Sequence, residues 1–167
     1  MKRAKYEDLF QEGLAKLYDA EKQIVAALPK MMAASSSMEL SGALDAHLED
    51  TKQQVARLES IFERMGEQPG GECRVMQALL DEGDRLIAEF EKSPELDTAL
   101  IAAAQKVEHF EIAAYRSMCA LAEVLGQEEL FDLLETTLAE EMEADETLNE
   151  ASESILGGDT EEPVEAA

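Results

Sequence analysis

The apolar residues of this chain recur every three or four positions over long stretches, which is the spacing of one face of an α-helix. In the first stretch this face is formed by Phe10, Leu14, Leu17, Ile24 and Leu28. The same periodicity predicts long helices over 5–34, 36–65, 94–125 and 128–156, and a shorter helix over 73–91. We therefore expect an all-α fold.

Capping residues mark where two of these helices should begin. Ser36 and Glu39 have the spacing of a capping box, so the second helix is predicted to start there. Ser93 followed by Pro94 is typical of an N-cap and the first helical position, which sets the start of the helix that runs to residue 125.

Glycines mark the predicted helix ends. Gly66 and Gly126 follow the last apolar positions of their helices, where a left-handed residue commonly closes the last turn. Gly157 and Gly158 are expected to stop the final helix, and the acidic segment 157–167 is expected to be a disordered tail after a bundle over 1–156. Pro29 lacks an amide hydrogen and should kink the first helix.

The lengths of the connections predict the topology. The first and second long helices are joined by a short link, and so are the last two, so each pair should form an antiparallel hairpin. The link between the hairpins is long and contains the short helix, which lets it run back along helices of about 40 Å. Two hairpins joined by one long crossover indicate a ferritin-like four-helix bundle.

Polar residues interrupt each apolar face near the middle of its helix. These positions are Glu21 in the first long helix, His47, Asp50 and Gln54 in the second, Glu108 and Glu111 in the third, and Glu141 and Asp145 in the fourth. Because antiparallel helices of similar length bring their middles to one level, we expect these side chains to converge on one layer of the core. Residues three or four apart, such as Glu108 and Glu111, share a helix face.

Such a layer needs positive charge. An unpaired carboxylate removed from water costs several kcal/mol or takes up a proton, and no Lys or Arg is expected on these stretches of the core face. Metal ions are the simplest counter-charge. We predict two ions, iron most readily and manganese as the alternative, held by Glu21, His47, Asp50, Glu108, Glu111, Glu141 and Asp145. Gln54 and Tyr115 are expected to contact these ligands rather than the ions.

Charge and composition narrow the function classes. The net charge is −24, which disfavours nucleic acid and anionic membranes as partners. Cys73 and Cys119 form no CxxC pair and are expected to be free thiols. Segment 1–10 lacks the apolar core of a signal peptide and no apolar run is long enough to span a membrane, so we expect a cytoplasmic protein.

Several segments together resemble the YciE/YciF-type ferritin-like proteins. They are LYDAEKQ at 17–23, ALPKM at 27–31, HLEDT at 47–51, VEHFEIAAY at 107–115 and TLAEE at 137–141. The resemblance spans about residues 6–156 and implies a ferritin-like bundle, a homodimer, a link to bacterial stress responses and a di-metal site.

The chain departs from the usual di-iron pattern of Glu on two helices and Glu-x-x-His on the other two. Here His47 precedes Asp50, and Asp145 stands where a histidine would be expected. These departures leave two alternative functions. The first is oxidation of Fe(II) by O₂ or peroxide at the di-metal site. The alternative is a non-catalytic helical structural or interaction protein of the stress response, with a degenerate or structural metal site.

Overall fold

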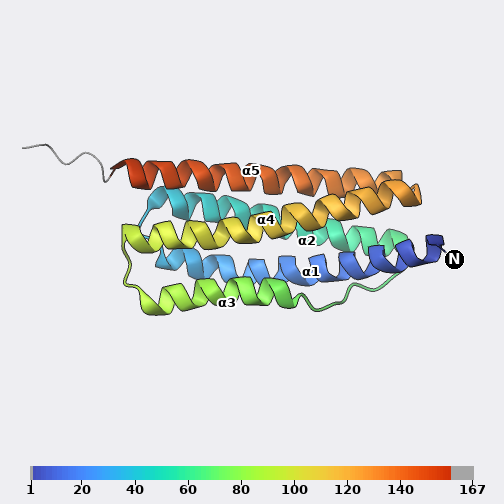
Figure 1. Ribbon diagram of the computed structural model, residues 1–167, viewed down its shortest axis with the longest axis horizontal. Helices are drawn as coiled ribbons and strands as arrows, with labels where there is room; N and C mark the ends of the chain where they lie inside the picture. Colours follow the sequence, from blue (N-terminus) through green and yellow to red (C-terminus); the bar gives the residue numbers. More distant parts are fainter. Residues whose placement is uncertain (1, 159–167) are drawn as a thin grey trace, which may run out of the picture.

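The structure, a computed structural model, describes residues 2–158 as five α-helices with no strand among them. The helices are α1 (Lys2–Ala34), α2 (Met38–Met65), α3 (Arg74–Glu89), α4 (Pro94–Leu125) and α5 (Glu128–Gly158). Figure 1 shows α1, α2, α4 and α5 side by side, with α3 on the outside of the bundle. Residues 159–167, which carry most of the predicted tail, lie outside the described part of the chain.

The four long helices close into a ring. Helix α1 packs against α2 and α4, and α5 packs against α4 and α2. The crossover returns along α1, and α3 then packs against both α1 and α4 (Figure 1). The predicted ferritin-like arrangement of two hairpins and one long crossover is thus confirmed.

Two predicted helix boundaries need correction. The N-cap of α2 is Ser37, whose hydroxyl accepts a hydrogen bond from the Leu40 amide at 3.2 Å, and not Ser36. The amide and hydroxyl of Ser36 instead donate to the carboxylate of Asp97 at the start of α4. At the other end of the chain, α5 includes Gly157, because glycine weakens a helix by about 1 kcal/mol without forbidding it.

The other boundaries follow the sequence closely. Gly66 and Gly126 adopt φ angles of 72° and 69°, the left-handed conformation that glycine reaches without strain. Ser93 caps α4 by accepting a hydrogen bond from the Leu96 amide at 3.3 Å. Helix α1 starts three residues earlier than predicted and continues through Pro29 without a break.

A polar anchor holds the crossover against α1. Asp19 accepts hydrogen bonds from the Cys73 amide at 2.7 Å and from the Gln23 side chain at 2.6 Å. The same Gln23 amide donates to the Cys73 carbonyl at 3.2 Å. Both backbone groups of the residue that precedes α3 are therefore satisfied by α1, which fixes where α3 begins.

The core consists of two apolar halves. One half, around Ile24, Leu44 and Leu100, lies toward the α1–α2 connection, and the other, around Leu14, Leu58 and Leu134, lies toward the α4–α5 connection. Cys73 and Cys119 are buried free thiols, one in each half. The level between the halves is where the polar side chains of the sequence meet.

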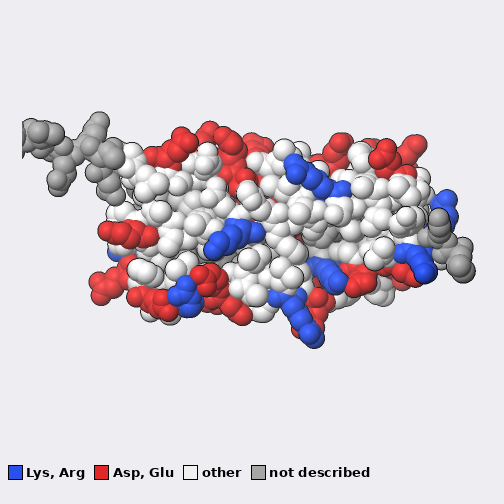
Figure 2. Space-filling model, viewed as in Figure 1, with Lys and Arg blue, Asp and Glu red and all other residues white. Residues whose placement is uncertain are grey.

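The surface is strongly acidic. On the face shown in Figure 2, Asp and Glu side chains gather along both long edges, with Lys and Arg scattered between them. Within residues 2–158, no helix combines the length and the apolar character needed to cross a membrane.

Candidate metal centre

Four of the predicted ligands form a compact group at the level between the two apolar halves. His47 comes from α2, Glu108 and Glu111 from α4, and Glu141 from α5, and all four are buried. Each offers one potential ligand atom, and these atoms all lie within 4.8 Å of one another. The i, i+3 spacing of Glu108 and Glu111 turns both carboxyl groups toward the same side of α4.

Glu21 of α1 joins this group from the remaining long helix. It is fully buried, and its Oε1 accepts a hydrogen bond from the Tyr115 hydroxyl. Tyr115 is itself fully buried on α4, one turn beyond Glu111. The side chain predicted to contact the ligands therefore contacts Glu21, and it holds one oxygen of that carboxylate in place.

Most of the carboxylate oxygens in this layer have no protein partner. Among the described residues, the buried oxygens without a hydrogen bond include Glu21 Oε2, Glu108 Oε2, both of Glu111, both of Glu141, and Asp145 Oδ1. The Nε2 atom of His47 lies 3.2 Å from Glu108 Oε1. Buried polar groups are normally satisfied, and this concentration of acceptors could hold a cation.

The electrostatics of the metal-free protein agree with this interpretation. Burial raises the pKa of Glu111 well above its ordinary value, and the negative charges of Glu21 and Glu141 raise it further. Burial and the charge of Glu141 likewise raise the pKa of Glu108. The pKa of Glu21 is also raised by burial and by Glu141, against the hydrogen bond from Tyr115 that lowers it. Without a cation these groups favour their protonated forms.

One cation near the layer was missed by the sequence analysis. Arg57 of α2 is largely buried and donates to both carboxylate oxygens of Glu140 on α5, at 2.8 and 2.9 Å, and to Thr137 at 2.6 Å. Arg57 lies beside the stretches of core face on which no Lys or Arg was expected. Arg57 sits at the edge of the apolar face of α2, and its long side chain reaches sideways to α5.

Gln54 contacts this same pair and not the predicted ligands. Its side-chain amide donates to Glu140 at 3.1 Å, and its Oε1 is buried without a hydrogen-bond partner in the described chain. Arg57 and Gln54 thus bind the residue next to Glu141, which fixes the rotation of α5 at the level of the layer.

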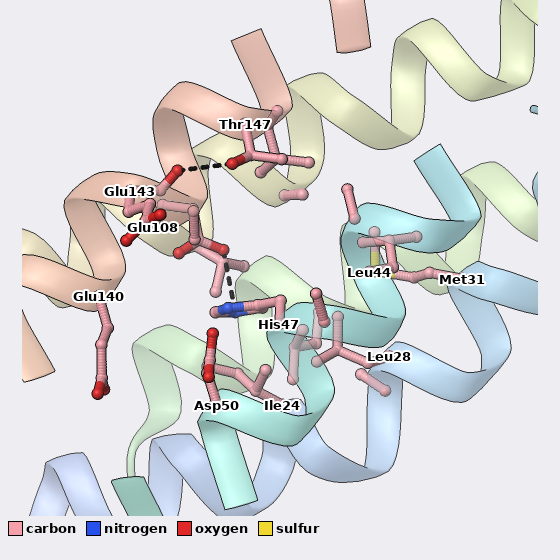
Figure 3. A pocket seen from close by; sticks show the side chains of 18 residues that line it. Ile24, Leu28, Met31, Leu44, His47, Asp50, Glu108, Glu140, Glu143 and Thr147 are labelled. Atoms are coloured by element: carbon pink, nitrogen blue, oxygen red, sulfur yellow. Dashed lines mark hydrogen bonds and ion pairs between the residues drawn. The ribbon is translucent and has the colours of Figure 1, made fainter. Parts of the chain in front are cut away.

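Besides Glu21, the structure leaves two predicted ligands, Asp50 and Asp145, outside the group of four. Asp50 is half-buried and points toward the His47 ring from α2, on a different side from Glu108 (Figure 3). Asp145 lies one turn beyond Glu141 and its Oδ2 is 3.0 Å from Nε2 of the exposed His109. The pKa of Glu108 is raised mainly by burial, then by the charges of Glu141 and Glu21. The charge of Asp145 raises it by a smaller amount. Asp145 therefore lies between the layer and the surface.

The donor set fits a metal ion. It consists of buried carboxylates and one imidazole, which suits iron or manganese and differs from the thiolate-rich sets of structural zinc sites. Carboxylates can bridge two ions, and Glu21 adds a further carboxylate from the opposite side of the group. The set contains fewer histidines than the usual di-iron bundle.

Comparison with known proteins agrees with this fold. Residues 5–160 match the family described as "Domain of unknown function (DUF892)". The chain belongs to the DUF892 family. Within it, the chain is 42% identical to protein YciF of Escherichia coli K12 over 147 residues, which cover 83% of this chain and 85% of YciF.

Three solved structures superpose well on this chain. The crystal structure of the E. coli stress protein YciF has a TM-score of 0.88 and 40% identity, covering 91% of this chain and 97% of YciF. YcfI from Rhodopseudomonas palustris has a TM-score of 0.83 and 41% identity, covering 86% of this chain and 92% of its own. A protein from Xanthomonas campestris, with a TM-score of 0.74 and 23% identity over 93% and 96% of the two chains, shows the fold alone. The chain described here is thus of the YciF type by family.

Proposed function

We propose that this chain is a metal-binding stress protein whose central layer holds two iron or manganese ions. The observation that carries the proposal is the set of buried, unpartnered carboxylate oxygens around a single imidazole. Repulsion among these carboxylates disfavours the charged, metal-free layer, and bound cations would remove that repulsion.

His47, Glu108, Glu111 and Glu141 would supply the principal ligands, with Glu21 as the carboxylate from α1. Tyr115 would orient Glu21, and Arg57 with Gln54 would hold the neighbouring Glu140 away from the layer. Bound iron in such a site supplies one-electron chemistry with O₂ or peroxide. The remaining residues of the layer exclude bulk water and keep the ligands in fixed positions.

The direct test is metal analysis of the protein purified without chelators. We expect close to two iron or manganese ions per chain, or uptake of Fe(II) under anaerobic conditions to that level. The Glu108→Gln/Glu111→Gln double variant keeps the side-chain shapes and removes the two charges, so its metal content should fall by more than half. Glu150→Gln, at an exposed position on α5, is the control and should leave the metal content unchanged.

A metal-free structural role is the second candidate. It is favoured by the raised pKa values of Glu21, Glu108 and Glu111, because protonated carboxyl groups can be buried without a cation. If the parent chain neither contains metal nor takes up Fe(II) or Mn(II), the metal proposal fails and the structural role stands.

A further inference from the structure

An apolar cavity of about 140 Å³ lies directly beside the carboxylate layer. Its walls are aliphatic and come from all five helices, and the buried members include Ile24, Leu28, Leu44, Ala104, Val107 and Leu148. His47, Asp50 and Glu108 form its polar end. In Figure 3, Leu28, Met31 and Leu44 lie on one side of His47, and Glu140 lies on the other.

The cavity has one exposed and one covered end. The lining residues Ala46 of α2, and Glu143 and Thr147 of α5, are exposed, so the cavity opens to solvent between these two helices. Leu80 of the crossover helix α3 covers the opposite end, behind α1 and α4. The small side chains of Ala43, Ala46 and Ala144 keep the opening between α2 and α5 from being filled.

We propose that this cavity binds a small molecule with an apolar body of about four to six carbon atoms and one hydrogen-bond donor group, a hydroxyl or an ammonium, that meets Glu108 and His47. A cavity of about 150 Å³ lined by aliphatic and aromatic side chains stays dry and binds benzene in an engineered protein. The present cavity is of similar size, which sets the size of the ligand. Its aliphatic walls offer dispersion contacts, which select an apolar body. Its charged lining residues are all acidic, namely Asp50, Glu108, Glu140 and Glu143.

The polar end selects the single polar group. Glu108 is almost fully buried and its Oε2 has no hydrogen-bond partner in the described chain, so a ligand hydroxyl there would satisfy an orphaned acceptor. An anionic group at this end would meet the carboxylates of Asp50 and Glu108 and would be repelled. The cavity shares Glu108 and His47 with the proposed metal site but does not require bound metal, so binding is tested in metal-free protein.

The test uses three probes with the same four-carbon chain, namely 1-butanol, butyrate and butylammonium, added to metal-free protein. Binding is followed by methyl NMR of Leu44 and Leu148 in the cavity, with Leu134 in the other apolar half as the internal control. We expect saturable shifts of Leu44 and Leu148 with the two hydrogen-bond donors, 1-butanol and butylammonium, none with butyrate, and no shift of Leu134. Equal shifts at all three leucines, no shift of Leu44 and Leu148 with either donor, or binding of butyrate as tight as that of the donors, would overturn the proposal.

Variants that fill the cavity complete the test. Ala104→Leu places three more carbon atoms against the bound chain and should weaken 1-butanol binding by about tenfold or more. Ala102→Leu, an exposed alanine on the same helix that does not line the cavity, should leave binding unchanged. If Ala104→Leu does not fold, as shown by loss of its helical circular dichroism signal, Ala144→Leu replaces it. Ala144 is half-buried at the opening of the cavity. Unchanged binding in a folded filling variant contradicts the assignment of this cavity.

Discussion

Three buried carboxyl groups couple the stability of the bundle to pH. The pKa values of Glu21, Glu108 and Glu111 are raised above the ordinary value of 4.5, chiefly by burial. In the window between that value and the raised ones, the folded state binds more protons than the unfolded state. The stability from these groups is therefore fully present below the ordinary pKa and is lost as the pH rises through the folded pKa.

We accordingly predict that the metal-free protein melts at a lower temperature at about pH 8 than at about pH 5. Each unit by which a folded pKa exceeds the unfolded one corresponds to about 1.4 kcal/mol of this change. Thermal unfolding monitored by circular dichroism over a pH series measures it. Glu111→Gln should flatten the profile, whereas the exposed Glu150→Gln should leave it as it is; a parent profile that rises with pH would contradict the raised pKa values.

The hydrogen bond between Tyr115 and Glu21 gives a second prediction at this scale. Tyr115→Phe removes the hydroxyl and leaves both oxygens of a fully buried carboxyl group without a protein donor. We expect a loss of about 1–3 kcal/mol in the free energy of unfolding, measured by urea denaturation of metal-free protein at neutral pH. The Tyr115→Phe/Glu21→Gln double variant should lose less than the sum of the two single variants, because the two side chains act as a pair.

Between elements, a single buried carboxylate ties the α1–α2 connection to the start of α4. Asp97 is 1% exposed and accepts from both the amide, at 2.9 Å, and the hydroxyl of Ser36. The helix ends on this side of the bundle are thus joined by hydrogen bonds as well as by apolar packing.

We predict that Asp97→Ala lowers the free energy of unfolding by about 2–4 kcal/mol, because two hydrogen bonds to a buried carboxylate are lost. Ser36→Ala should cost about 1 kcal/mol, because the amide of residue 36 keeps its bond to Asp97. Urea denaturation of the two single variants and the double variant forms the cycle that isolates the coupling. Additive losses would show that Asp97 stabilises α4 by another route.

The elements themselves were predictable from the sequence. Helix positions followed from apolar periodicity, and Ser93, Gly66 and Gly126 marked their ends because these residues act locally. Ser36 was misassigned as the cap of α2 because it and Ser37 offer the same hydroxyl. The choice between them depends on Asp97, which is 61 residues away in sequence.

Across the whole molecule, the acidic layer opposes folding unless a cation neutralises it. We predict that Glu111→Gln raises the melting temperature of the metal-free protein at neutral pH and lowers its affinity for Fe(II) or Mn(II). Calorimetry with and without metal measures both effects. In the parent chain, metal at about a hundred times its dissociation constant should add about 2.7 kcal/mol of stability.

A stability gain without any change in metal response would favour the metal-free structural role. A loss of stability in Glu111→Gln would show instead that the carboxyl group makes a favourable contact in the folded protein. The control is Glu150→Gln, which carries the same chemical change on the surface.

The sequence by itself determined which residues are helical, which face of each helix is apolar, and where polar residues interrupt that face. These properties depend on spacing along one chain segment, at 1.5 Å and 100° per residue. The tertiary structure alone decided how each helix is rotated and shifted against its neighbours. That choice places His47, Glu108, Glu111 and Glu141 together. Asp145, about 6 Å beyond Glu141 along α5, is instead turned toward His109 of α4. It also brings Arg57 to Glu140 and leaves the cavity beside the layer, because both depend on side chains from different helices meeting in space.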